Sequence, residues 1–310
     1  MIYGVIAISV LCLTVKGYCG KRTSCLIKST NDAFIYNLLR MLFCIAIVSV
    51  FVLAGNSQSY LHVEWEMLAI CLLAGVTNVT VLVGWFMIIR RCSLVSVNIG
   101  TTLGSIVPAV MCAFVFGESI SPFKMLGFSL VFCATLVLAS GTKTGGGKRS
   151  LLLPLVAVAD GMSSFAQQLY KQFYTETGDY AHGIFYPKNV YHFYNYVFTA
   201  FTLVMLLAIF AARSPRPKRI TEYRSRDPII PTRAVFHIFV MAVCLFAANY
   251  LQTVAASDYG MTSQVLYPFI RGGCLITVNI TAVLFGEKFT LRSAVGSLVA
   301  LGGIVIMSVL

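Results

Sequence analysis

The sequence predicts an all-α integral membrane protein with ten transmembrane helices, arranged as two five-helix repeats of opposite orientation. Hydrophobic residues make up 58% of the 310 residues and charged residues only 11%, whereas about a quarter of a typical soluble chain is charged. Apolar runs of roughly 18 residues or more recur along the chain, which is the length needed to cross a bilayer. A glycine–glutamate pattern that occurs twice is the basis for predicting the repeat.

The apolar runs define the predicted helices. The first run starts at Ile2 and lacks a basic leading segment and a small-residue cleavage site, so we expect a retained helix and not a signal peptide. The helices are expected at residues 2–19, 33–54, 66–89, 93–116, 123–141, 151–173, 190–212, 234–256, 261–285 and 292–310. Residues 1–141 form the first repeat and residues 151–310 the second. Residues 142–150, TKTGGGKRS, are expected to be a flexible linker because of their three glycines.

Two corresponding stretches carry the internal repeat. Each ends an apolar run with Phe-Gly-Glu and continues, after a short polar spacer, into another apolar run with a glycine at the same offset. A shift of 169 positions superposes Gly104 on Gly273, Ala113 on Ala282, Phe116-Gly117-Glu118 on Phe285-Gly286-Glu287, and Gly127 on Gly296. Each glutamate precedes a helix N-terminus, where a carboxylate can cap free amides. We therefore expect structural and not catalytic roles for Glu118 and Glu287.

The distribution of basic residues predicts the orientation. Of the 23 Lys and Arg residues, 18 belong to the segments that follow the odd-numbered helices, with Lys16 counted among them. Basic loops favour the cytoplasmic side, so both termini are expected on the outer side. An odd number of helices per repeat then makes the second repeat inverted relative to the first. Many secondary transporters share this plan, with a binding site near the midplane where the repeats meet.

Composition and motifs exclude several other classes of protein. The net charge of +12 does not indicate nucleic-acid binding, because the basic residues lie in short loops where topology and anionic head groups account for them. The ten cysteines form no C-x-x-C pair and have no accompanying histidine cluster, so neither a disulfide framework nor a metal site is expected. The chain contains no nucleotide-binding loop, Ser-His-Asp set or zinc motif. We expect no cofactor and no enzymatic activity.

Three charged residues lie within predicted spans. A charge at membrane depth costs about 2.5–3.5 kcal/mol and needs a partner, a wet cavity or a route to the interface. Asp160 and Arg271 lie about 13–14 Å into their helices at ~1.5 Å per residue. They either form a buried ion pair, or Arg271 attracts a carboxylate or phosphate with Asp160 as counter-charge or proton carrier. Arg40 is close enough to a helix end to extend outward, so we prefer a structural role for it and keep it as a candidate contact.

The helix at 151–173 carries polar residues at every third or fourth position, which places them on one face. These residues are Asp160, Ser163, Ser164, Gln167 and Lys171. A polar stripe in a spanning helix must face protein or water. We predict that it lines a pathway, with hydrogen bonding between helices as the alternative.

Further polar residues complete the candidate substrate-binding set. Asn98, Asn249 and Gln252 lie in other predicted spans, where such residues are individually more often packing contacts. Tyr267 stands beside Pro268, which removes one helical hydrogen bond. Together with Gly272 and Gly273, which remove side-chain bulk, this proline predicts a hinge at the level of the cargo.

The doubled pattern resembles the drug/metabolite transporter superfamily, in its ten-helix EamA-type branch. The resemblance covers essentially the whole chain and is most specific from Tyr267 through Gly286-Glu287 to Gly296 and Gly303. This stretch is also similar to the last two helices of the small multidrug resistance proteins. Those pumps bind protons and drug at an acidic residue in their first helix, whereas the run at 2–19 has none. The resemblance implies the plasma (cytoplasmic) membrane of a bacterium, although EamA-type carriers are described with cytoplasmic termini, opposite to the loop charges here.

These observations favour a secondary transporter that moves a small polar or charged metabolite by alternating access. The gradient of a coupling proton or ion, or that of the cargo itself, would supply the energy. The alternative is a proton-coupled exporter of cationic drugs with Asp160 as the switching carboxylate. A membrane-embedded enzyme is disfavoured because no nucleophile, base or metal cluster is recognisable. A purely structural membrane protein would not need charges along a deep polar stripe.

Overall fold

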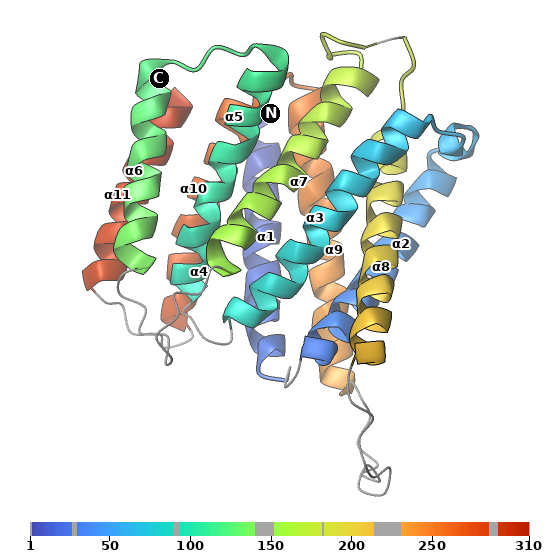
Figure 1. The fold of residues 1–310 in the computed structure, drawn as a ribbon, viewed down its shortest axis with the longest axis horizontal. Helices are drawn as coiled ribbons and strands as arrows, with labels where there is room; N and C mark the ends of the chain where they lie inside the picture. Colours follow the sequence, from blue (N-terminus) through green and yellow to red (C-terminus); the bar gives the residue numbers. More distant parts are fainter. Residues whose placement is uncertain are drawn as a thin grey trace, which may run out of the picture.

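The computed structural model describes residues 2–26, 30–89, 94–139, 152–181, 183–213, 231–284 and 291–309. The predicted linker at 142–150 and the second Phe-Gly-Glu at 285–287 lie outside these residues. Most of the described residues lie in helices (Figure 1). The helices are α1 (Ile2–Ser24), α2 (Thr30–Ala54), η1 (Ser57–Leu61), α3 (Trp65–Ile89), α4 (Leu94–Thr102), η2 (Leu103–Ser105), α5 (Ile106–Phe116), α6 (Pro122–Ala139), α7 (Leu152–Tyr174), α8 (Lys188–Arg213), α9 (Thr232–Ser257), α10 (Ser263–Leu284) and α11 (Leu291–Val309).

The composition of these helices is that of a helical membrane protein. Five of them, α1, α2, α3, α8 and α9, are long and apolar enough to cross a bilayer. Shorter apolar stretches occur at Gly100–Phe116, Pro122–Ala134 and Ala294–Met307. Large apolar side chains are exposed on the surface, among them Phe114, which is 87% exposed, and Leu298, which is 70% exposed. Such side chains need hydrocarbon around them.

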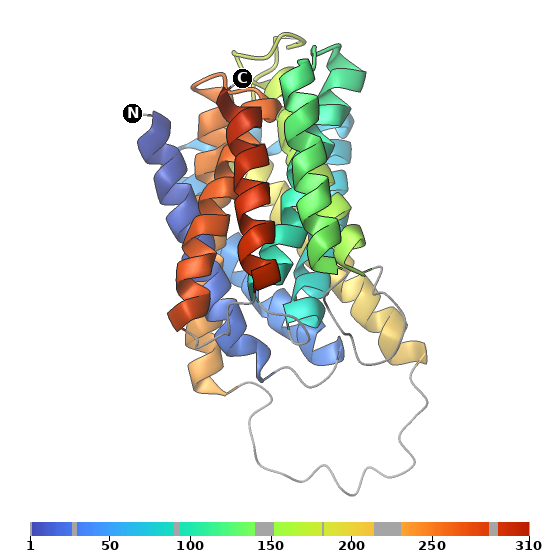
Figure 2. The same cartoon turned by 90° about the vertical axis from the view of Figure 1, so that its left-hand side faces the viewer.

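The helices run side by side, and both chain termini lie at the same end of the bundle (Figures 1 and 2). The most extensive contacts join helices that are distant in the sequence. They pair α1 with α9, α6 with α11, α3 with α7, α3 with α8, and α2 with α8. Helices from the first part of the chain, α1 to α6, therefore pack against helices from the second part, α7 to α11.

The helix expected at 93–116 is not continuous, which corrects the prediction. It consists of α4 and α5 separated by the 3-10 turn η2. Pro108 has no N–H to donate to the carbonyl of Gly104, four residues earlier, so the regular helical pattern is interrupted there. The chain tightens into a 3-10 turn, in which the Ile106 N–H bonds the Leu103 carbonyl.

The break at η2 lies directly against α7. A Cβ atom added to Gly104 would lie 2.8 Å from the Ala157 carbonyl and 2.9 Å from Oδ2 of Asp160. A Cβ atom added to Gly161 would lie 2.5 Å from the Gly104 carbonyl. Two glycines thus allow the backbones to touch beside a charged side chain.

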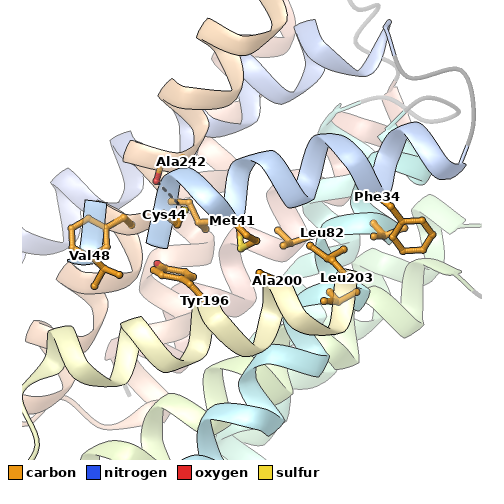
Figure 3. Close-up of a cluster of buried hydrophobic side chains, with 13 residues drawn as sticks. Phe34, Met41, Cys44, Val48, Leu82, Tyr196, Ala200, Leu203 and Ala242 are labelled. Atoms are coloured by element: carbon orange, nitrogen blue, oxygen red, sulfur yellow. Dashed lines mark hydrogen bonds between the residues drawn. The ribbon is translucent and has the colours of Figure 1, made fainter. Parts of the chain in front are cut away.

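The largest apolar core joins α2, α3, α8 and α9 (Figure 3). Met41, Leu82 and Tyr196 are buried in it from three different helices. The Cys44 thiol donates to the Ala242 carbonyl at 3.6 Å and so links α2 to α9. This core supports one wall of the site described below.

A polar cluster joins α5 and α6 to the start of α10. Oε2 of Glu118 accepts from the Ser263 hydroxyl at 3.4 Å and from Nε2 of Gln264 at 3.2 Å. Lys124 donates to Oε1 of Gln264 at 2.9 Å. Glu118 does not cap the helix that follows it, which corrects the expectation. Ser121 does so, because its hydroxyl accepts from the Lys124 N–H at 3.3 Å.

Candidate functional site

Two adjoining cavities lie at the centre of the bundle. The amide cavity, of about 80 Å³, is lined by the carboxamides of Asn78, Gln167, Asn195, Asn249 and Gln252. The cationic cavity, of about 60 Å³, is lined by Arg40, Trp85, Asn98 and Thr101 among others. Lys16, Asp160 and Arg271 border both cavities and define their junction. Each cavity is large enough for several water molecules.

Arg271 and Asp160 form an ion pair at the junction. Nη2 of Arg271 donates to Oδ2 of Asp160, joining α10 to α7. The two side chains are 20% and 17% exposed, so both still reach the cavity space. The sequence allowed either a buried ion pair or a charged cavity. The structure has an ion pair whose two residues also line the cavities.

Lys16 is the residue that the sequence analysis misplaced. The first helix was expected to end at residue 19, and Lys16 was counted with the basic segment that follows it. The helix continues to Ser24, so Lys16 lies two turns before the C-terminal end of α1. Its side chain borders both cavities. It lies within electrostatic range of Arg40, Arg271 and Asp160. Within the described part of the chain it makes no hydrogen bond or ion pair.

Arg40 faces the cationic cavity and does not extend to the interface, which corrects the expectation. The residue is only 3% exposed. Nη2 donates to Oδ1 of Asn37 at 2.6 Å, and the guanidinium lies over the Phe86 ring, 5.7 Å from its centroid. Nε has no hydrogen-bond partner among the described residues. The apolar core around α2 separates this side chain from the bundle surface.

The amide cavity is bordered by a hydrogen-bond network that joins three helices. Nδ2 of Asn78 donates to Oδ1 of Asn195 at 2.9 Å, and the Ser163 hydroxyl donates to Oδ1 of Asn78 at 2.9 Å. The network links α3 to α8 and α7. Asn78 and Ser163 thus combine a packing role with a place on the cavity wall.

A second network passes through Gln167. Its Nε2 donates to the Thr253 hydroxyl at 2.5 Å, and its Oε1 accepts from the Tyr267 hydroxyl at 3.0 Å. The same Tyr267 hydroxyl lies 2.9 Å from the Ser164 carbonyl, and either oxygen can accept its proton. Tyr267 is buried behind Gln167 and lines neither cavity, so its predicted contact with a substrate would be indirect.

The remaining predicted residues divide between the two cavities. Ser164, Asn249 and Gln252 line the amide cavity, while Asn98 lines the cationic one. Nδ2 of Asn249 donates to the Tyr196 hydroxyl at 3.3 Å, and Nε2 of Gln252 donates to the Ser9 hydroxyl at 3.3 Å. Lys171, the last residue of the polar stripe, is buried but lines neither cavity.

The segment predicted as a hinge is a continuous helix in this structure. Pro268 lies inside α10. A Cβ atom on Gly272 would lie 2.7 Å from Cγ2 of Ile304, and one on Gly273 would lie 2.8 Å from Cγ2 of Val10. Both glycines therefore allow close packing of α10 against α11 and α1. Bending at this segment stays a prediction.

Sequence reasoning missed His192 and Asn195 as well as Lys16. His192 is 1% exposed and borders the amide cavity; Nε2 lies 2.9 Å from the Thr253 hydroxyl, and Nδ1 has no partner among the described residues. The sequence contained a signal for both residues. His192 and Asn195 lie near the start of the helix predicted at 190–212, and because they are three residues apart they share one face.

No protein-family model and no curated protein matches the chain. Among solved structures, 28 chains match. One of them, described only as a crystal structure of a protein, superposes with a TM-score of 0.61 at 13% sequence identity. The match covers 97% of this chain and 94% of that chain. Identity this low indicates a shared fold and carries no information about function.

Proposed function

We propose that the protein is a secondary transporter of the EamA type, which moves a small polar or charged metabolite across a membrane by alternating access. The observation that carries the proposal is the central cavity pair, bordered by Asp160, Arg271 and Lys16 deep within apolar helices. Charges at this depth are costly and typically mark substrate or ion pathways. The proposal includes ten spans, formed by two inverted five-helix repeats.

The contacts between helices support the inverted repeat. With α4, η2 and α5 counted as one fourth helix, the most extensive contacts have counterparts in the other repeat. Helix α1 packs on α9 as α7 packs on α3, and α2 packs on α9 as α8 packs on α3. Helix α1 contacts α10, and its counterpart α7 contacts α5 and η2. Helices that occupy the same position in the two repeats also contact each other, as in the pairs α2–α8, α4–α10 and α6–α11. This is the pattern of a two-fold axis in the plane of the membrane.

The helix ends and the basic residues support the orientation predicted from the sequence. The described helix ends on either side of the basic segments lie at the end of the bundle opposite the two termini (Figure 1). Moving Lys16 into α1 removes one charge from that side and leaves the bias strong. We propose that the termini face outward and that the basic end faces the cytoplasm of a bacterium.

Export of cationic drugs is the second candidate, because Asp160 borders both cavities. It is the only carboxylate among the described residues that line them. Its pairing with Arg271 makes this candidate weaker, since a cationic drug would have to displace a guanidinium held in the same protein.

The test is counterflow in proteoliposomes preloaded with pools of amino acids, sugars and phosphorylated metabolites. Uptake of a labelled member of one pool, driven by the unlabelled solute inside, is the expected result. Failure of every pool would contradict the transporter proposal. The Asp160→Asn variant separates the candidates. Complete loss of pH-dependent efflux of a cationic dye would favour drug export, while retained counterflow of a neutral or anionic solute would exclude it.

A further inference from the structure

The charges around the two cavities do not balance. Apart from His192, Cys274 and the tyrosines, the ionisable side chains that line them are Lys16, Arg40, Arg271 and Asp160. Asp160 is paired with Arg271. No carboxylate among the lining residues is left for the other two cations. The cavity therefore carries a net positive charge in the middle of an apolar bundle.

The two cations without a carboxylate also have unused hydrogen-bond donors. Lys16 makes no hydrogen bond or ion pair within the described chain, and Nε of Arg40 is unpartnered there. Leaving a buried charged donor unsatisfied is costly. In the neighbouring amide cavity, the carboxamides of Asn78, Gln167 and Asn249 all have partners. Among the described residues that line the cavities, the charged donors without a partner are thus Lys16, which borders both cavities, and Nε of Arg40, while Nδ1 of His192 is unpartnered beside the amide cavity.

We infer that this junction binds an anionic oxygen group, a carboxylate or phosphate, of a small soluble metabolite. The inference deepens the proposed function and rests on it in treating the bound anion as the cargo. Lys16 and Arg40 would contact the anion from α1 and α2, beside the Arg271–Asp160 pair. The neutral part of the metabolite would lie in the amide cavity, where Asn195, Asn249 and Gln252 can exchange their present hydrogen bonds for new ones. A compact ammonium and a planar guanidinium are both common ligands of such groups.

Matched pairs of soluble compounds test this assignment. The full-length protein, in phosphatidylcholine nanodiscs at constant ionic strength, is titrated with succinate and succinamide, glucose 6-phosphate and glucose, inorganic phosphate, and ethidium. Thermal unfolding reports binding, and calorimetry gives the Kd of each compound that binds. The expected result is stabilisation by at least one anion and not by its neutral partner or by ethidium.

Variants on α1 and α2 assign the site. Lys16→Gln or Arg40→Gln is expected to weaken anion binding about tenfold or more, as the loss of a charge-assisted contact does. Lys16→Arg should retain binding. Lys21→Gln, on the same helix but not lining either cavity, is the matched control. Unfolding curves without ligand verify that each variant is folded, and Arg40→Gln provides the same test if Lys16→Gln does not fold.

Anionic lipid is the other source of such a group, and nanodiscs containing phosphatidylglycerol examine it. Stabilisation by phosphatidylglycerol alone, lost in Lys16→Gln, would overturn the assignment to a soluble anion. So would equal stabilisation by charged and neutral partners, insensitivity to both glutamine variants, or no stabilisation by any anion. Counterflow of neutral solutes without anion binding would refute this inference and leave transport standing. Lys16-dependent anion binding without any counterflow would support the anion site and refute the transport proposal.

Discussion

The carboxamides and the cations that line the two cavities differ in how completely their hydrogen bonds are satisfied. Around the amide cavity, carboxamides and hydroxyls bond one another across α3, α7, α8 and α9, so that they hold the helices together. Within the described part of the chain, Lys16, at the junction of the two cavities, and Nε of Arg40, in the cationic cavity, have no hydrogen-bond partner. Satisfied polar groups stabilise a fold, while unsatisfied charges reduce its stability. The comparison indicates that the carboxamides contribute to holding the helices together, whereas Lys16 and Arg40 do not stabilise the fold through charge pairing.

The strongest test of this comparison is to break the ion pair at the junction. Asp160→Asn leaves Arg271 as a third cation without a carboxylate. The variant is expected to lose about 3 kcal/mol of unfolding free energy, at the lower end for a broken buried pair because both side chains keep some exposure. Chemical or thermal unfolding in detergent measures the loss. The double variant Asp160→Asn, Arg271→Gln should recover much of it. An unchanged single variant would show that the pair does not stabilise the fold.

A smaller effect is expected where the backbone of η2 touches α7. Gly104→Ala places a methyl group 2.8 Å from the Ala157 carbonyl and 2.9 Å from Oδ2 of Asp160. Overpacking of this kind typically costs about 1–3 kcal/mol. Gly302→Ala is the control, because nothing lies within 4 Å of its added Cβ, and it should be neutral or slightly stabilising. Equal stabilities of the two variants would mean that α4–α5 and α7 can separate without cost.

Loss of one amide-cavity hydrogen-bond centre should have a moderate effect. Asn78→Ala removes a donor to Asn195 and an acceptor for Ser163. About 1–2 kcal/mol of unfolding free energy should be lost, because both partners remain partly buried without it. Thr80→Ala, on the same helix, removes an exposed hydroxyl and serves as the control. A loss no larger than that of the control would contradict a structural role for this cavity's network.

The smallest change in stability is expected at the cationic cavity. Lys16→Met keeps the length of the side chain and removes a charge that has no partner and lies near two other cations. Without ligand, the variant should unfold with equal or up to about 1 kcal/mol greater free energy. Lys21→Met provides the background value for a lysine on α1. A loss of more than about 1 kcal/mol would show that Lys16 stabilises the fold and would remove the contrast between the cavities.

Much of this site follows from periodicity and depth in the sequence. Asp160, Ser163, Ser164 and Gln167 share a face of a helix that must avoid lipid, and the structure places all four on the amide cavity. Depth alone selected Asp160 and Arg271, because no short route leads from them to water. Periodicity cannot state that two residues 111 positions apart meet, since that depends on how helices cross.

The errors have local causes. Lys16 was misplaced because it was counted with the basic segment after the first helix, whereas α1 continues to Ser24 and packs on α9. The break at η2 was missed because an apolar run conceals the effect of Pro108 on a carbonyl four residues earlier. Arg40 was expected to reach outward because distance to a helix end was considered without the core that surrounds α2.

The cluster of Glu118, Lys124, Ser263 and Gln264 has a consequence for movement at the end of the bundle that carries the termini. Its contacts are hydrogen bonds between side chains at helix ends; Ser263 and Gln264 are buried in the packed state, and water can replace each partner once the helices separate. Separating α10 from α5 and α6 there would exchange these hydrogen bonds for hydrogen bonds to water and would not expose an apolar surface at the cluster. The contacts of this cluster can therefore break and re-form repeatedly at a low free-energy cost.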